Sequence, residues 1–202
     1  MYRSILLTIA ALLLIAVNAP AESIDGRLGV VARIGATVPM KDDFIKGTSD
    51  TKAGLAVGGG LIYGFSEYMA ADVEVLHMPK LDVHANGVKT YEAAITDVSL
   101  ELQYRFLTGN KLVPYLGFGP DFITADLKHV NGTGYKLDWT YGGHVNFGFD
   151  WFITPGIALT TDFRGVYAVD GDVLSGSSKV SEYSPQWLQG TVGVRLMLPR
   201  KF

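Results

Sequence analysis

A serine, a histidine and several carboxylates occur in segments that share one residue pattern, and hydrolases use this set of groups. Ser99 follows Asp97 by two positions, and His144 and Asp162 stand in later segments. A serine nucleophile needs an adjacent general base, which a third group in turn orients. The sequence therefore raises a hydrolase hypothesis. Its merit depends on where the surrounding elements point these side chains.

Arginines and carboxylates form a larger set of residues that could bind ions or take part in chemistry, and they recur along the whole chain. The candidate charges are Arg33, Arg105, Arg164 and Arg195, with Asp72, Glu74, Glu101, Asp150 and Asp162. Charges that fold away from water are tolerated when they pair with one another. Such a set therefore forms either a closed ionic network or the lining of an ion path.

The segment around Ser99 indicates which element carries these side chains. Apolar and polar residues alternate strictly over ten positions, from Asp97 to Phe106. This period of two predicts a β-strand with one apolar face and one strongly polar face. In a soluble sandwich the apolar face would meet the core. In a transmembrane barrel it would meet lipid, and the charges would line the lumen.

Weaker copies of this pattern complete a set of eight predicted strands. They cover Arg27–Val38, Ala53–Phe65, Met69–Met78, Ala94–Phe106, Val113–Ala125, Trp139–Ile153, Ile157–Val169 and Gln186–Leu198. Their lengths suit a tilted crossing of the hydrocarbon layer, which takes about 9–11 residues. The 24 glycines and 8 prolines also favour an all-β chain with many turns.

The connections between these strands alternate in length. The short ones are Ser66–Tyr68, Leu107–Leu112 and Thr154–Gly156, and the long polar ones are Pro39–Lys52, Pro79–Ala93, Asp126–Asp138 and Asp170–Pro185. Short periplasmic turns and long extracellular loops are typical of outer-membrane barrels. Lipocalins also have eight strands, but they do not sort their loops in this way. We therefore predict an all-β, eight-stranded antiparallel transmembrane up-and-down β-barrel, and a soluble lipocalin-like carrier is the remote alternative.

The predicted register turns the candidate chemistry inward. The interior of an eight-stranded barrel is about wide enough for its own side chains to fill it. We therefore expect the charges to form a salt-bridged polar plug, with an ion-selective pore as the alternative. Ser99, His144 and Asp162 also point into the lumen, whereas barrel lipid hydrolases display their catalytic groups toward lipid. We expect no enzymatic activity, no cofactor and no metal site.

The inward residues also differ along the barrel axis. Apolar side chains gather near the long loops, and the charges lie in the half near the short turns. The apolar set includes Trp187, Leu76, Met78, Ile95 and Val166. We interpret it as an apolar vestibule with Trp187 as a gate or binding wall, where small hydrophobic molecules would bind. The alternative is that these residues only pack the stems of the loops.

The N-terminus predicts export. Arg3 precedes an apolar run of 13 residues, Ile5–Val17, and Ala19-Pro20-Ala21 has the small residues of a cleavage site. We therefore divide the chain into a signal peptide, residues 1–21, and an outer-membrane barrel, residues 22–202. The formal net charge of −3 does not suit a nucleic-acid surface, and the absence of cysteine leaves no disulfide framework.

Several segments resemble the OmpW family of small outer-membrane barrels, within the wider OmpA/OmpX-like superfamily. They are Arg33-Ile34-Gly35, Val113-Pro114-Tyr115-Leu116-Gly117-Phe118-Gly119, Gly148-Phe149-Asp150-Trp151, and Pro185 with Trp187. The resemblance covers nearly the whole mature chain, although Pro199-Arg200-Lys201 precedes Phe202 where the family usually ends in Tyr-Arg-Phe. It implies a narrow channel for small hydrophobic molecules with a lateral exit through the barrel wall.

These observations lead to one expected function and one alternative. We expect an outer-membrane barrel that contacts membrane lipid and takes up small hydrophobic solutes. We also expect the terminal Phe202 to be recognised by the outer-membrane assembly machinery. The alternative is a barrel that transports nothing and whose long loops serve adhesion, stress resistance or envelope integrity.

Overall fold

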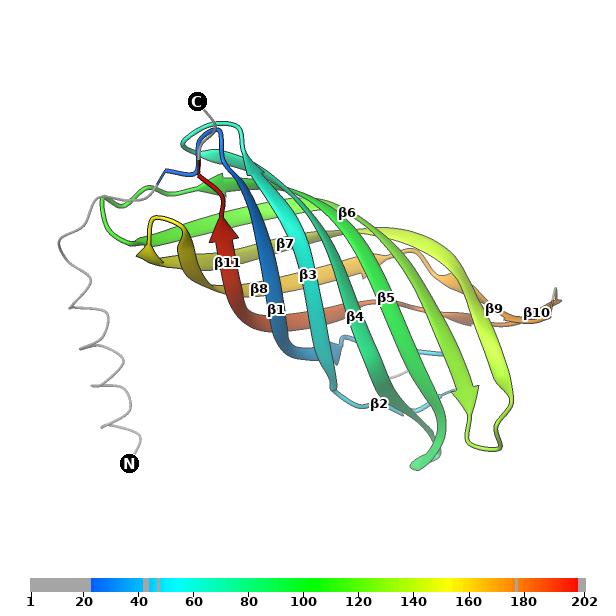
Figure 1. Ribbon diagram of the computed structural model, residues 1–202. Coiled ribbons are helices and arrows are strands. Elements are labelled where there is room, and N and C mark those ends of the chain that lie inside the picture. The colour runs from blue at the N-terminus through cyan, green and yellow to red at the C-terminus, as the bar shows by residue number, and fades with distance from the viewer. Residues whose placement is uncertain (1–22, 42–43, 47, 177, 200–202) are drawn as a thin grey trace, which may run out of the picture.

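A closed antiparallel barrel forms the body of the protein (Figure 1). The computed structural model describes residues 23–41, 44–46, 48–176 and 178–199. The wall strands are β1 (Leu28–Pro39), β3 (Gly54–Gly64), β4 (Met69–Ala85), β5 (Val88–Arg105), β6 (Leu112–His129), β7 (Gly134–Thr154), β8 (Ile157–Ala168) and β11 (Trp187–Met197). Each pairs with the next in this order, and β11 closes the ring against β1. The predicted fold class is therefore confirmed, while the expected leader, residues 1–21, and Phe202 lie outside the described residues.

The register of the wall agrees with the alternation in the sequence. Buried and exposed residues alternate along each long strand, so one face of every strand points into the lumen. Leu100 and Phe147 are exposed on the outer face, whereas Arg105 and Asp150 are fully buried inside. No helix among the described residues is long and apolar enough to cross a membrane.

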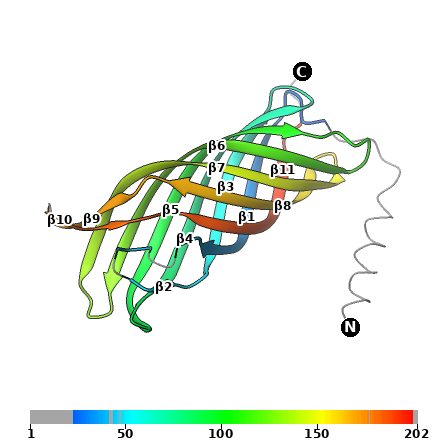
Figure 2. The same ribbon diagram turned by 180° about the vertical axis from the view of Figure 1, so that it is seen from behind.

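Three of the predicted long loops are largely strand, so their prediction was wrong. β4 and β5 continue to a two-residue turn at Asn86 and Gly87, whose φ angles are 51° and 77°. Positive φ at both positions is the geometry of a tight hairpin turn that matches the strand twist. β6 and β7 likewise extend to a turn after His129, and β9 (Gly171–Ser175) pairs with β10 (Ser178–Tyr183). These hairpins project from the end opposite the short turns (Figure 2). We call the two ends the hairpin end and the short-turn end.

The connection between β1 and β2 (Asp50–Thr51) remains mostly without regular structure, and it crosses the hairpin end. We call its described part, residues 40–41, 44–46 and 48–49, the strap. On one side Lys46 N donates to Glu182 O at 3.0 Å, and on the other Ser49 N donates to His84 O at 2.8 Å. Phe44 and Ile45 are 1% and 4% exposed. The strap therefore spans the opening with the side chains of Phe44 and Ile45 turned into the barrel.

The lumen has three layers rather than the two that we predicted. An upper apolar cluster lies at the hairpin end, the charges occupy the middle, and a lower apolar cluster closes the short-turn end. The lower cluster comprises Ile24, Ile62, Ala70, Val113, Phe152, Ala158 and Met197. Arg27, the first residue of the first predicted strand, donates at the rim to the carbonyls of Leu198 and Met197, at 3.0 and 3.2 Å. The prediction of a charged floor is therefore wrong at the outermost level.

Candidate functional site

The upper part of the charged layer is built around Arg164 and Arg33. Arg164 Nη2 lies 3.0 Å from Glu74 Oε2 and 2.9 Å from Glu101 Oε2. Arg33 Nη1 lies 3.2 Å from Asp162 Oδ2, and its Nε lies 3.4 Å from Glu74 Oε1. These side chains are at most 3% exposed. Carboxylates from the three strands β4, β5 and β8 thus meet two guanidinium groups inside the lumen.

The lower part of the charged layer is built around Asp150. Its carboxylate accepts from Arg105 Nη2 at 2.6 Å and also from Arg195 Nη1. The Tyr115 ring lies between the two guanidinium carbons, 5.7 Å from that of Arg105 and 5.6 Å from that of Arg195. Arg195 also approaches Asp72 at 3.8 Å. All nine predicted network residues are therefore buried in one connected region, which has the pairing that a plug requires.

The residues of the hydrolase hypothesis have other partners. Ser99 Oγ accepts from Arg164 Nη1 at 3.1 Å, and His144 Nδ1 lies 2.9 Å from Asp121 Oδ1. The other ring nitrogen of His144 faces Glu101 at 3.4 Å. The structure thus engages Ser99 and His144 with the ionic network rather than with each other. In the described part of the chain, no group of three or more His, Asp or Glu residues is arranged to hold a metal ion.

Asp97 is the exception within this layer. It is 1% exposed, and neither carboxylate oxygen has a hydrogen-bond partner among the described residues. Its cross-strand neighbours Leu76 and Ile123 belong to the upper apolar cluster. Asp97 therefore stands at the boundary between the two layers without an ion pair to any described residue, whereas Asp72, whose oxygens also lack hydrogen bonds, faces Arg195 at 3.8 Å.

We expect Asp97→Asn to raise the free energy of unfolding by about 1 kcal/mol, because an uncompensated buried carboxyl is removed. Asp150→Asn is the matched control. It should lower that free energy, since Asp150 pairs with Arg105 and Arg195. Urea titration of the barrel folded in lipid would measure both changes. A loss of stability in Asp97→Asn equal to that in Asp150→Asn would contradict this account of the layer.

The five residues predicted as a vestibule lie together in the upper cluster. Trp187, Leu76, Met78, Ile95 and Val166 are each at most 2% exposed. Register explains the grouping, because Trp187 pairs with Val166 and Met78 pairs with Ile95. Phe44 and Ile45 of the strap pack into the same cluster. The structure therefore places these residues in packed apolar contact beneath the strap.

A cavity of about 460 Å³ lies above this cluster. Its lining combines the strap with the three hairpins and comprises Ile45, Lys46, Thr48, Ala85, Thr90, Tyr91, Leu127, Tyr135, Val173, Ser175, Val180 and Ser181. Ile45, Leu127 and Val173 belong to both the cavity lining and the cluster. We call this space the mouth cavity, and its floor is the top of the upper cluster.

Sequence reasoning missed the mouth cavity because its residues fell in segments predicted as loops. Part of the signal was present, since inward apolar residues recur at a spacing of two at Leu81 and Val83 and at Ala125 and Leu127. Asn86-Gly87 and Asn131-Gly132, flanked by such patterns, also indicate hairpins. Continuing the alternation would have placed Leu127 correctly, but in β4 a register shift between Met78 and Leu81 moves the inward face by one residue, which alternation does not predict.

Ion pairs and ring contacts stiffen the hairpins around the mouth cavity. Lys89 Nζ lies 2.6 Å from Asp82 Oδ1 and 3.0 Å from Glu92 Oε2, and its hydrogen bonds hold the pKa of both carboxyls below their usual range. The rings of Tyr91 and Tyr135 meet nearly edge to face, with centroids 6.3 Å apart. The wall of the cavity is therefore a set of cross-linked strands rather than independent loops.

Comparison with known proteins agrees with this architecture. OprG from Pseudomonas aeruginosa aligns with a TM-score of 0.62 at 15% identity, covering 90% of this chain and 99% of that one. Neisserial surface protein A aligns with a TM-score of 0.61 at 16% identity, covering 85% of this chain and 97% of that one. Escherichia coli outer membrane protein W aligns with a TM-score of 0.50 at 13% identity, covering 85% of this chain and 98% of that one. No curated protein sequence matches the chain. A family model described as the outer membrane protein β-barrel domain matches residues 7–195. The chain therefore belongs to the family of outer-membrane β-barrel proteins.

Proposed function

We propose that this barrel captures small hydrophobic molecules at its hairpin end, which we take as the extracellular side, and releases them sideways into the membrane. The observation that carries the proposal is the continuity of the mouth cavity with the upper apolar cluster through Ile45, Leu127 and Val173. Small-molecule sites combine apolar walls with a few polar groups that orient the ligand, and the lining of the mouth cavity contains both kinds of residue. Trp187 and its neighbours would receive the solute after Phe44 and Ile45 move aside.

The straight path through the barrel does not suit an apolar solute. Below the upper cluster lie paired charges, and below them the lower apolar cluster with Ile24 at 0% exposure. An apolar molecule gains nothing by separating buried ion pairs, because each parted charge would need new partners. Release through the barrel wall does not require the solute to pass between the paired charges at the centre of the lumen. This supports a lateral route.

One segment of the wall supports a lateral exit. Between β5 and β6 the paired positions run from Ser99–Asp121 directly to Leu102–Phe118. Pro120 lies opposite this interval and has no backbone N–H to donate. A solute could part the strands there at a low cost in hydrogen bonds, and it would leave at the edge of the charged layer, beside Ser99 and Asp121. The lateral route and the resemblance to the OmpW family are both parts of this proposal, as are export by residues 1–21 and assembly through Phe202.

Binding of an apolar fluorescent probe to the barrel in lipid nanodiscs tests the capture step. We expect Leu127→Asp to abolish saturable binding, because Leu127 is 3% exposed in the floor of the mouth cavity and a charge there would hold water. Val130→Asp, in the same hairpin and 62% exposed, is the control and should bind as the unmodified protein does. Equal binding in both variants would refute capture at this cavity.

The second candidate is a non-transporting barrel whose extracellular hairpins serve adhesion, stress resistance or envelope integrity. The observation that favours it is the ionic network, in which Arg33, Arg164 and Glu74 are buried and paired across the lumen. Solute uptake and cell adhesion by a deletion strain separate the two functions. Selective loss of uptake supports the first function, whereas normal uptake with altered adhesion or a fragile envelope supports the second.

A further inference from the structure

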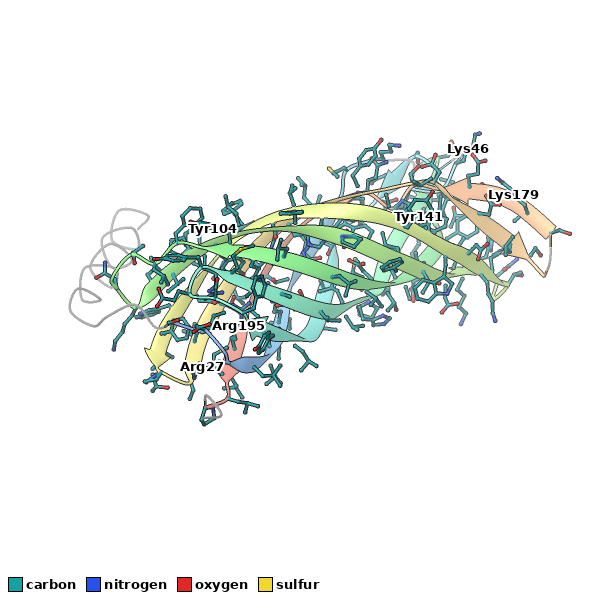
Figure 3. All side chains as sticks on the ribbon, turned by 90° about the horizontal axis from the view of Figure 1, so that it is seen from above. Arg27, Lys46, Tyr104, Tyr141, Lys179 and Arg195 are labelled. Carbon is teal, nitrogen blue, oxygen red and sulfur yellow. The ribbon has the colours of Figure 1, made fainter. Side chains whose placement is uncertain are left out.

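The mouth cavity carries one kind of formal charge. Among the described residues that line it, Lys46 is the only one with a formally charged side chain, and none of these lining residues is Asp or Glu. The other polar groups are hydroxyls, including those of Ser175 and Ser181. Figure 3 shows Lys46 at the hairpin end, near Lys179 and far from Arg27 and Arg195. The cavity thus offers one cation beside an apolar wall.

From this arrangement we infer that the mouth cavity selects amphipathic molecules with a carboxylate head, such as medium-chain carboxylic acids. The inference rests on the proposed function and adds the class of ligand. The apolar body would lie against Ile45, Leu127 and Val173, and the carboxylate would meet the Lys46 ammonium. An ionic hydrogen bond of this kind is stronger than a neutral one. A neutral alcohol of the same length lacks it, and an ammonium head is repelled.

The strap fixes the position of Lys46 but leaves its ammonium available. Lys46 N donates to Glu182 O at 3.0 Å, and the neighbouring Ile45 pairs with Tyr183, so the backbone is held against β10. The ammonium itself lies 3.6 Å from Glu182 Oε2, and the side chain is 77% exposed. It can therefore turn to a ligand without losing a close ion pair.

Glu182 is the internal competitor for Lys46. Its carboxylate bonds more closely to Lys179, with Nζ 2.8 Å from Oε1. The hydrogen bond from Lys179, with a smaller effect from Lys46, holds the pKa of Glu182 below its usual range. Glu182 is therefore ionised at neutral pH and opposes a ligand carboxylate near Lys46. Removing its charge should strengthen carboxylate binding, whereas removing the charge of Lys46 should weaken it.

Calorimetric titration of the full-length mature barrel in zwitterionic nanodiscs with octanoate, octanol and octylammonium tests the inference, with empty nanodiscs subtracted. We expect octanoate to bind more tightly than octanol, and octylammonium more weakly. Lys46→Gln should lower octanoate affinity about threefold to fivefold and leave octanol unchanged, and Glu182→Gln should raise octanoate affinity by a similar factor. Lys128→Gln, exposed on the β6–β7 hairpin and outside the cavity lining, is the matched control and should change neither ligand.

The possible outcomes separate this inference from the proposed function. Binding of octanol without a preference for octanoate, or octanoate affinity that is unchanged in both Lys46→Gln and Glu182→Gln, overturns the carboxylate inference and leaves capture of hydrophobic molecules standing. An equal loss of affinity for octanoate and for octanol in Lys46→Gln also overturns it, since the lysine would then contribute packing rather than charge. Failure of all three compounds to bind overturns both proposals.

Discussion

Arg164→Ala should destabilise the folded barrel by about 3–5 kcal/mol, because it leaves buried carboxylates without their cation. The guanidinium of Arg164 reaches Glu74, Glu101 and Ser99 from the opposite side of the lumen. The side chain of Arg164 is 1% exposed, so water would not reach the carboxylates to solvate them after the guanidinium is removed. The loss is larger than for a surface ion pair, whose contribution is commonly below about 1 kcal/mol.

Urea titration of the barrel folded in lipid vesicles measures this effect, and Arg27→Ala provides the control. Arg27 donates to backbone carbonyls at the rim rather than to buried acids, so its loss should cost about 1 kcal/mol or less. If Arg164→Ala unfolds at the same urea concentration as Arg27→Ala, the middle layer is hydrated and the plug interpretation is wrong. A large, stable single-channel conductance in the unmodified protein would lead to the same conclusion.

Phe147→Arg should destabilise the barrel by about 2–4 kcal/mol, because it places a cation on the lipid-facing surface near the midplane. Phe147 is 48% exposed on the outer face of β7, and its ring stacks on Phe163 with centroids 5.1 Å apart. Its neighbour Asn146 points inward and donates to Asp162 at 2.7 Å, which sets the height of Phe147 at the charged layer. The substitution therefore desolvates a charge and removes a ring contact.

Phe147→Leu is the matched control, since it removes the ring contact and keeps the surface apolar. It should cost about 1 kcal/mol, the typical worth of an aromatic pair. Folding yield and urea midpoint in lipid vesicles report both variants. If Arg is tolerated as well as Leu at this position, the outer face is not in contact with hydrocarbon.

The wall of the barrel could be predicted from the sequence because its physical constraint is local. A shift of one residue in β5 would bring Glu101 and Arg105 to lipid and turn Leu100 inward, so alternation alone determines the register. The pairing of Met78 with Ile95 then follows from the strand directions. For the same reason the grouping of Trp187 with Val166 was accessible from the sequence.

The two closures of the barrel could not be predicted in this way. The strap has no repeating pattern, and the burial of Phe44 depends on its contact with Tyr183, 139 positions further along the chain, with ring centroids 5.9 Å apart. The lower cluster depends on Ile24, which precedes β1 and is held because Gly26 N donates to Gly64 O at 2.7 Å. Such contacts are set by the closed barrel and not by neighbouring residues in the sequence.

The mouth cavity lies between these cases. Its walls continue the strands β4, β5, β6 and β7, but register shifts interrupt their alternation, and polar residues such as Lys80, Lys89 and Lys128 gave these segments the composition of loops. In the structure these lysines belong to the strands, and Lys89 pairs with Asp82 across the hairpin. The polar composition of these extensions indicated that they leave the membrane. The Asn-Gly turns indicated that they remain paired as β-hairpins.

The central claim is that solutes enter through the mouth beneath the strap, and a disulfide that locks the strap tests it most directly. Ile45 and Tyr183 form an antiparallel bridge whose flanking hydrogen bonds, Lys46 N to Glu182 O and Ser184 N to Phe44 O, mark it as a non-hydrogen-bonded pair. Such pairs have Cα atoms about 4.5 Å apart, within disulfide range. The chain contains no cysteine, so the double variant Ile45→Cys/Tyr183→Cys has one possible bond.

The measurement is the rate at which an apolar fluorescent probe passes from buffer into the bilayer of proteoliposomes, before and after reduction of this disulfide. We expect the oxidised barrel to transfer probe no faster than protein-free liposomes. Reduction should restore transfer to the level of the single variants Ile45→Cys and Tyr183→Cys. Equal transfer by the oxidised and reduced barrels would contradict entry beneath the strap.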